Sequence, residues 1–145
     1  MPKRSAHTSW TGGLPDGSGH VTLTSSGAGA YDVSFPKRAA DDASGTTSPE
    51  ELIAAAHSSC YAMQLSALIA AGGGTPVGLE VDATVALSPD PAGGFRISNI
   101  EIVVRGTVEG MDEEGFKKVA NDAKAQCPVS KALTGTTITL DAALR

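Results

Sequence analysis

Residues 48–71 read SPEELIAAAHSSCYAMQLSALIAA and form the longest apolar pattern in the chain. Ser48 suits a helix N-cap, Pro49 suits the first helical position, and Glu51 completes an S-x-x-E capping box. Three glycines follow at 72–74, which is how helices commonly end. The pattern therefore predicts one helix over this stretch, about 36 Å long at a rise of 1.5 Å per residue.

Apolar residues extend around most of the circumference of this helix. A surface helix would show one apolar stripe opposite a polar face, so a helix of this kind is buried on more than one side. We expect a sheet of the same chain to cover one side and a second subunit to cover the other. We expect no membrane span, because polar residues between His57 and Gln64 interrupt the run.

Five runs rich in β-forming residues are expected to be strands: residues 19–25, 30–35, 79–88, 95–108 and 136–144. The first two runs flank a Gly-rich turn and predict a hairpin. Residues 1–18 are polar and Gly-rich, with Trp10 as the single large anchor, and no strand is expected there.

Two more helices are expected near the C-terminus. Asp112 suits the N-cap of a helix that runs to Gln126, with acidic residues at its start and lysines further on. Cys127 and Pro128 then open a short helix to Leu133, because proline fits the first helical position.

The composition suits one globular domain. A chain of 145 residues, of which 41% are hydrophobic, can build a core without disulfides or metals. Because there are no repeats and no linker, we predict a single α+β domain over residues 1–145. The net charge of -5 argues against a nucleic-acid partner, since phosphate binding needs a basic surface. The N-terminal segment lacks the apolar region of a signal peptide, so we expect a cytoplasmic location.

The two cysteines stand in different settings, Cys60 inside the long helix and Cys127 at the start of a short one. A helix N-terminus stabilises a thiolate through its dipole and its free N–H groups. There is no CxxC pair and the three histidines are scattered, so we expect no metal site and no cofactor. The two thiols suggest a redox pair. The alternatives are a small core residue for Cys60 and a structural cap for Cys127.

A reactive Cys60 needs a positive charge nearby, because apolar surroundings raise the pKa of a thiol. No Lys or Arg occurs between Arg38 and Arg96, so the long helix carries no cation of its own. Lys37 and Arg38 precede the helix, and Arg38 is preferred because a guanidinium stays charged when buried. Glu50 is expected to hold this arginine, since a carboxylate beside the thiol would raise the thiol pKa.

Residues 48–60, SPEELIAAAHSSC, and residues 127–130, CPVS, resemble the two signature segments of the OsmC/Ohr family of thiol-dependent peroxidases. The resemblance extends over nearly the whole chain. It implies that Cys60 attacks the peroxide, that Cys127 resolves the product, and that Glu50 belongs to the site.

The position of the arginine indicates the branch of the family that the sequence resembles. In the Ohr branch the arginine follows a Thr-Gly-Gly near the N-terminus, where this sequence has Leu14. In the OsmC branch it lies in the loop before the glutamate, where Lys37 and Arg38 stand. The sequence therefore resembles the OsmC branch, with Arg38 in the site.

The resemblance also implies a fold and a reaction. The implied fold is α+β, with antiparallel sheets packed around the two long central helices of an intertwined homodimer. Cys60 would reduce organic hydroperoxides, and hydrogen peroxide less well, between apolar walls that include Tyr61 and Met63. Its sulfenic acid would form an intramolecular disulfide with Cys127, and an external thiol would then reduce that disulfide. The expected role is defence against oxidative or osmotic stress.

Two other functions are compatible with the same residues. His57 lies three positions before Cys60 on the helix, so a Cys-His hydrolase with Glu50 orienting the histidine is one alternative. It is disfavoured because consecutive groups on one regular helix leave no cleft for an acyl substrate. The other alternative is a dimeric redox-sensing or ligand-binding module without peroxide turnover.

Helix geometry separates Glu50 from Cys60 of the same chain. Ten positions along one helix place their backbones about 15 Å apart along the axis and about 80° apart around it. An antiparallel partner helix can deliver the carboxylate instead. We therefore expect Glu50, together with Arg38, to serve Cys60 of the other subunit.

Overall fold

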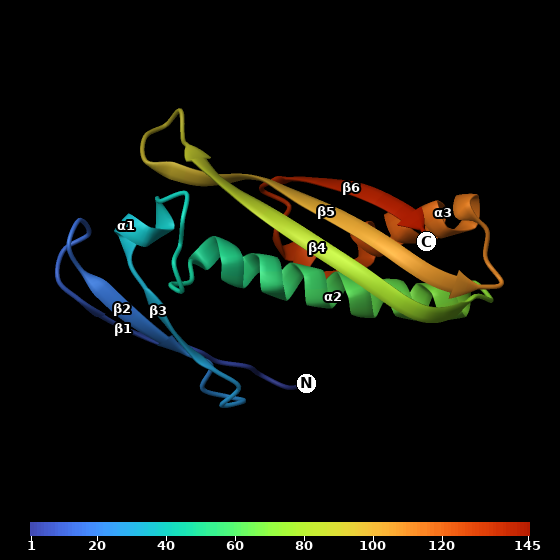
Figure 1. The fold of residues 1–145 in the computed structure, drawn as a ribbon, viewed down its shortest axis with the longest axis horizontal. Coiled ribbons are helices and arrows are strands. Elements are labelled where there is room, and N and C mark those ends of the chain that lie inside the picture. The colour runs from blue at the N-terminus through green and yellow to red at the C-terminus, as the bar shows by residue number, and fades with distance from the viewer. The chain divides into compact units, whose positions relative to one another are not determined.

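The computed structural model describes residues 1–145, which form two compact units, Met1–Leu52 and Ile53–Arg145. The elements in chain order are β1 (His7–Thr11), β2 (Ser18–Thr22), β3 (Ala30–Val33), α1 (Phe35–Arg38), α2 (Pro49–Ala71), β4 (Thr75–Pro89), β5 (Phe95–Glu109), α3 (Glu113–Gln126), α4 (Pro128–Ala132) and β6 (Thr137–Leu144) (Figure 1). The α+β class is confirmed, and the single domain stays a prediction.

The first unit, Met1–Leu52, contains an antiparallel sheet in the order β1-β2-β3. The hairpin of β2 and β3 is confirmed, although both strands end earlier than expected. Strand β1 was missed, because its five residues are all exposed and carry no alternation of buried and exposed positions. Helix α1 was also missed, although Ser34 caps it by accepting a hydrogen bond from the N–H of Lys37, at 3.3 Å. Pro36 in its first turn was the available signal.

The second unit, Ile53–Arg145, contains a sheet in the order β4-β5-β6. Strands β4 and β5 are antiparallel, but β6 runs parallel to β5. The expectation of purely antiparallel sheets was therefore wrong for this unit. The chain between β5 and β6 passes through α3 and α4, and a helical crossover of this kind lets the next strand run in the same direction.

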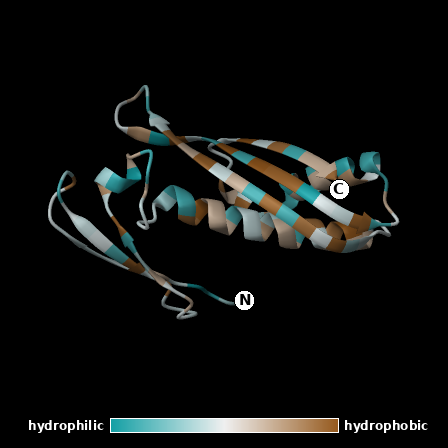
Figure 2. Cartoon of the chain, in the orientation of Figure 1, coloured by the Kyte–Doolittle hydropathy of each residue, from teal (hydrophilic) through white to brown (hydrophobic).

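One face of this sheet forms the core of the second unit. Ile100, Ile102 and Val104 of β5 are fully buried, whereas the residues between them are more exposed. Figure 2 shows the matching alternation of hydrophobic and hydrophilic residues along β4 and β5. Successive side chains of a strand point to opposite faces, so the buried β5 residues share one face. Helices α2 and α3 cover that face, since their side chains belong to the same cluster.

Helix α2 begins and ends as the sequence predicts. The N–H of Glu51 donates to Ser48 Oγ at 3.1 Å, and Gly73 turns the chain away with a φ of 87°. The expected capping box is only half formed. The Glu51 carboxylate accepts a hydrogen bond from the Thr47 hydroxyl, at 2.7 Å, instead of returning to the N-cap backbone.

A stripe of α2 residues spaced four apart is fully buried: His57, Tyr61, Leu65 and Ile69. The Tyr61 hydroxyl donates to the carbonyl of Ala120 in α3, at 2.9 Å. Tyr61 is thus a core residue, and the expectation that it lines a substrate pocket was wrong. Met63 lies away from the stripe and is 73% exposed in the single chain. The expectation that a sheet of the same chain covers one side of α2 is confirmed.

Helix α2 is also long and apolar enough to cross a membrane, judged by length and composition alone. The polar residues near its middle therefore do not exclude a span on this criterion, contrary to our expectation. One such helix is weak evidence for a membrane span, because the core helix of a soluble protein meets the same criterion.

We expect Gly106→Ala to destabilise the protein, because an added Cβ would lie 2.8 Å from two ring carbons of the fully buried Phe116. Overpacking of a dense core costs about 1–3 kcal/mol of unfolding free energy. Urea denaturation measures this loss. Gly78→Ala on the neighbouring strand is the matched control, since nothing lies within 4 Å of its added Cβ. Equal losses in the two variants would contradict the assignment of the effect to Phe116.

Candidate active site

The two cysteines meet inside the second unit. Their Sγ atoms lie 3.1 Å apart and share a hydrogen bond, although 67 positions separate them in sequence. Both are free thiols, Cys127 fully buried and Cys60 partly buried. This separation allows the two sulfurs to react directly with each other once one of them is oxidised.

The backbone around Cys127 explains the position of its sulfur. The Cys127 N–H donates to Ala123 O in the last turn of α3, at 2.9 Å. Its carbonyl accepts from Lys131 N, at 3.0 Å, as the first hydrogen bond of α4. Cys127 therefore ends one helix and caps the next, and Pro128 needs no N–H partner at that position. The predicted site of Cys127 at a helix N-terminus is confirmed.

The surroundings act in opposite directions on the two thiols. Burial raises the pKa of Cys60, and the backbone N–H of Val129 offsets only part of this effect. Burial also acts to raise the pKa of Cys127, but the N–H of Ser130, the Cys60 thiol, the Ser130 hydroxyl and the N–H of Val129 together lower it. The sulfur of Cys127 makes no capping hydrogen bond with a backbone N–H of α4, so the N–H groups of Ser130 and Val129 act on the thiol as nearby dipoles.

His57 is fully buried and contacts the same helix terminus. Its Nε2 lies 2.7 Å from Ser130 Oγ, within hydrogen-bond distance, and its Nδ1 has no hydrogen-bond partner. Burial lowers the pKa of His57. Neither ring nitrogen bonds to Cys60, so the arrangement lacks the base–nucleophile pair of a Cys-His hydrolase. Sequence reasoning missed Ser130, whose signal was its place three residues after Cys127.

Arg38 and Glu50 form an ion pair inside the first unit. Nε of Arg38 donates to both carboxylate oxygens at 3.1 Å, and Nη2 donates to Oε1 at 2.6 Å. Glu50 is only 7% exposed, whereas Lys37 is exposed. Paired hydrogen bonds of this kind suit a planar guanidinium and not a lysine. The expected contact between Arg38 and Glu50 is confirmed.

The fold of the first unit brings this pair together. The loop after α1 returns to β3, where Thr47 N donates to Asp32 O at 3.0 Å and Val33 bridges to Thr47. Helix α1 and the first turn of α2 are thus held at the same end of β3. The structure therefore assembles two pairs of candidate residues, each within one unit.

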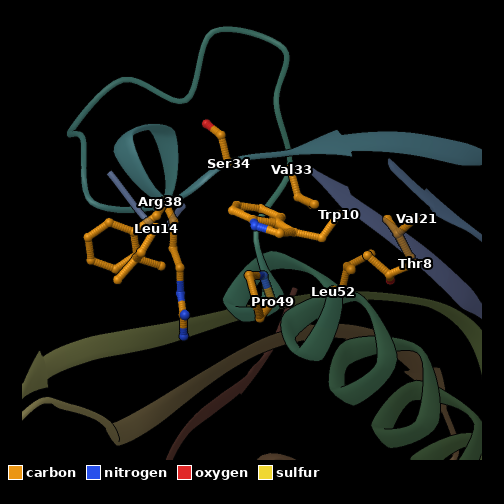
Figure 3. A pocket seen from close by; sticks show the side chains of 10 residues that line it. Thr8, Trp10, Leu14, Val21, Val33, Ser34, Arg38, Pro49 and Leu52 are labelled. Atoms are coloured by element: carbon orange, nitrogen blue, oxygen red, sulfur yellow. The ribbon is translucent and has the colours of Figure 1, made fainter. Parts of the chain in front are cut away.

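A cavity of about 350 Å³ lies in the first unit beside Arg38. Its lining is mostly apolar, with Thr8, Ser34 and Arg38 as the polar residues. The lining residues are Thr8, Trp10, Leu14, Val21, Val33, Ser34, Phe35, Arg38, Pro49 and Leu52. Figure 3 shows the Trp10 ring, Val33, Pro49 and Leu52 around the same space. A guanidinium at an apolar cavity suits a ligand with an apolar body and a polar or anionic end. No group of three His, Cys, Asp or Glu side chains is arranged to hold a metal ion.

Comparison with known proteins places the chain in a family. Residues 41–141 match the family model described as OsmC-like protein. The chain is 36% identical over 143 residues to peroxiredoxin OsmC of Escherichia coli (strain K12), covering 99% of this chain and 96% of that protein.

Two solved structures are similar in fold. An organic hydroperoxide resistance protein from Elizabethkingia anophelis gives a TM-score of 0.81 at 26% identity, covering 100% of this chain and 98% of that one. The organic hydroperoxide resistance protein OhrB of Bacillus subtilis gives a TM-score of 0.74 at 29% identity, covering 95% and 97%. With the two signature segments and the paired thiols, these matches show that the chain belongs to the OsmC family.

Proposed function

We propose that this protein is a thiol-dependent peroxidase that reduces organic hydroperoxides to alcohols in the cytoplasm. The observation that carries the proposal is the pair of free thiols with sulfurs 3.1 Å apart. Relatives named peroxiredoxin OsmC and organic hydroperoxide resistance protein support the same chemistry. The proposed role is defence against oxidative or osmotic stress.

The proposed reaction has three steps. The Cys60 thiolate attacks one peroxide oxygen, the O–O bond breaks, and the alcohol leaves after taking up a proton. Cys60 is then a sulfenic acid, and Cys127 attacks its sulfur to form a disulfide and release water. Two external thiol groups then reduce the disulfide by thiol–disulfide exchange; they become a disulfide themselves, and both cysteines are restored as thiols.

Arg38 is proposed to activate Cys60. Burial raises the pKa of Cys60, so the thiolate needs a cation that its own surroundings do not provide. Glu50 holds the guanidinium through Nε and Nη2, which leaves Nη1 available to face a thiolate or a peroxide oxygen. The pairing of Glu50 with Arg38, and not with Lys37, supports this choice.

The cavity beside Arg38 is proposed to select the substrate. An organic hydroperoxide has an apolar body and a polar O–O end, which match the apolar lining and the guanidinium. Hydrogen peroxide has no apolar body and gains nothing from such walls. We therefore propose that organic hydroperoxides are better substrates than hydrogen peroxide.

A homodimer is proposed to complete the site. Met63 of α2, with Trp10 and Leu14 of the first unit, is more than 40% exposed in the single chain. A second subunit that covered these side chains would remove apolar surface from water, which favours association. Since helix geometry keeps Glu50 about 15 Å from Cys60 along one helix, we propose that Glu50 and Arg38 act on Cys60 of the partner subunit.

A redox-sensing module without turnover would also use two neighbouring thiols. It would form the disulfide once per oxidation and would not consume peroxide continuously in the presence of a thiol reductant. Peroxide consumed per protein chain, with dithiothreitol present, separates the two functions.

We expect Cys60→Ser to abolish the reduction of tert-butyl hydroperoxide, because no other thiol receives the first oxygen. Cys127→Ser is the matched variant at the second thiol. It is expected to react once and then stall, with added oxygen on Cys60 in the mass spectrum. Full turnover in Cys60→Ser, or full turnover in Cys127→Ser without oxidised Cys60, would contradict the assigned roles.

We expect Arg38→Ala to raise the pKa of Cys60 and to slow peroxide attack by about tenfold to a hundredfold, because a charge-stabilising donor is lost. Titration of thiolate absorbance in a Cys127→Ser background follows the Cys60 thiol alone. Lys37→Ala is the matched control and is expected to leave both quantities unchanged, since Lys37 is exposed. A shift in the Lys37 variant alone would assign the role to the neighbouring residue.

Mixed dimers test the cross-subunit site. Subunits with Cys60→Ser and subunits with Glu50→Ala are each expected to be poorly active. After chain exchange, a random mixture is expected to recover about a quarter of wild-type activity, because half the dimers carry one complete site out of two. No recovery, with heterodimers shown by native mass spectrometry, would place Glu50 and Cys60 of one chain in the same site.

A further inference from the structure

His57 is a buried titratable residue that has no role in the proposed reaction. Its side chain is fully buried, and its Nδ1 lacks a hydrogen-bond partner. Buried polar side-chain atoms are nearly always paired, so an exception calls for an explanation. An apolar side chain of similar size would fill the same space without this unpaired atom.

The other ring nitrogen connects His57 to the thiol pair. Nε2 of His57 lies 2.7 Å from Ser130 Oγ. Ser130 is the third residue of α4 and Cys127 is the N-cap of that helix, an arrangement in which the two side chains are neighbours. The Ser130 hydroxyl lowers the pKa of the Cys127 thiol, and the sulfur of Cys127 in turn contacts the sulfur of Cys60. A line of exchangeable protons therefore runs from the thiols to His57.

A hydroxyl can carry a proton along this line in one step. It donates one hydrogen bond and accepts others, so Ser130 can receive a proton from Cys127 while it donates its own to Nε2. After the transfer the same contacts persist with the donors reversed. His57 Nε2–H then donates to Ser130, and Ser130 donates to the Cys127 thiolate.

We propose that His57, acting through Ser130, accepts the thiol proton of Cys127 when Cys127 attacks the sulfenic acid of Cys60. The proposal rests on the proposed peroxidase function and concerns its second step. The S–S bond forms as the S–O bond of Cys60 breaks. The Cys127 proton passes to His57, the departing oxygen takes up a proton to leave as water, and His57 then releases its proton.

Charged and titratable groups lie near this line. Lys124 of α3 and Lys131 of α4 line one cavity with Ser130. The titratable groups on the thiol side are Cys127, Cys60 and Tyr61, whose pKa is raised first by burial and then by the charge of Cys127. Because burial lowers the pKa of His57, its ring is neutral at pH 7 and able to accept a proton.

The experiment is a single turnover with His57→Gln. Glutamine can still hydrogen-bond to Ser130 but is not a base. Reduced protein is mixed with one equivalent of tert-butyl hydroperoxide, and quenched samples are analysed by mass spectrometry. Added oxygen reports the oxidation of Cys60, and the later loss of that oxygen as water reports disulfide formation.

We expect His57→Gln to slow disulfide formation by about tenfold to a hundredfold, the effect of losing one proton-transfer group. The oxidation of Cys60 is expected to slow much less. The wild-type rate of disulfide formation is expected to be flat with pH above the lowered pKa of His57. The variant rate is expected to rise with pH, because the reaction then depends on direct ionisation of Cys127.

Three further variants keep the result interpretable. Ser130→Ala breaks the line and is expected to reproduce the slow disulfide step, whereas Ser130→Thr keeps a hydroxyl and is expected to restore it. His20→Gln, at an exposed histidine of the first unit, is the control for the substitution itself. If His57→Gln does not fold, the comparison of Ser130→Ala with Ser130→Thr decides the question.

The two proposals fail in different ways. If the wild-type protein does not consume the hydroperoxide, the peroxidase function is wrong. If the wild-type protein forms the disulfide and His57→Gln or Ser130→Ala forms it at the same rate and pH dependence, the relay alone is wrong. Equal slowing of both steps would also overturn the relay, since it would indicate a purely structural role.

Discussion

The contact between the sulfurs of Cys60 and Cys127 is the interaction on which the chemistry depends. It exists because two helices present their side chains to each other inside one core. A stripe of α2 residues spaced four apart faces the sheet and α3. Cys127, the residue just before α4, belongs to the same core and its thiol is buried. The bond between Tyr61 and the Ala120 carbonyl and the contact between His57 and Ser130 fasten α2 to the same region.

The surroundings of the two thiols have opposite net effects on their pKa values. Cys60 sits in the middle of a helix, where backbone N–H groups are already bonded, so burial dominates and raises its pKa. Burial also acts to raise the pKa of Cys127, but this residue stands at a helix N-terminus, where the N–H groups of Ser130 and Val129, together with the Cys60 thiol and the Ser130 hydroxyl, outweigh burial and lower the pKa. The groups that hydrogen-bond to each sulfur, rather than burial, therefore distinguish the two thiols. A peroxide-attacking Cys60 must obtain its thiolate from a charge outside its own helix.

The Arg38–Glu50 pair has the properties that such a charge requires. The carboxylate is nearly buried, and it holds the guanidinium through two of its nitrogens. The pair is built by a loop that returns to β3, so it forms within the first unit without help from the thiols. A thiol pair and a preformed cation suit peroxide reduction better than acyl transfer, for which His57 would have to bond to Cys60.

Local chemistry determined much of this protein from its sequence. The N-cap residues of α2 and α3, the glycines that end α2 and the place of Cys127 at a helix N-terminus depend on residues a few positions apart, and these predictions are confirmed. The predicted contact between Arg38 and Glu50, twelve positions apart, is also confirmed, whereas the activation of Cys60 by Arg38 stays a prediction. Strand β1 and helix α1 were missed because a polar edge strand and a one-turn helix carry weak local signals.

Only the tertiary structure decided which distant residues meet. Cys60 contacts Cys127 across 67 positions, and His57 contacts Ser130 across 73. The parallel direction of β6 and the burial of Tyr61 were likewise decided by the tertiary structure. These features depend on which face of α2 the sheet and α3 cover. An α2 sequence that is apolar around most of its circumference does not specify that face, because the free energy of burying one side over another depends on the residues that cover it.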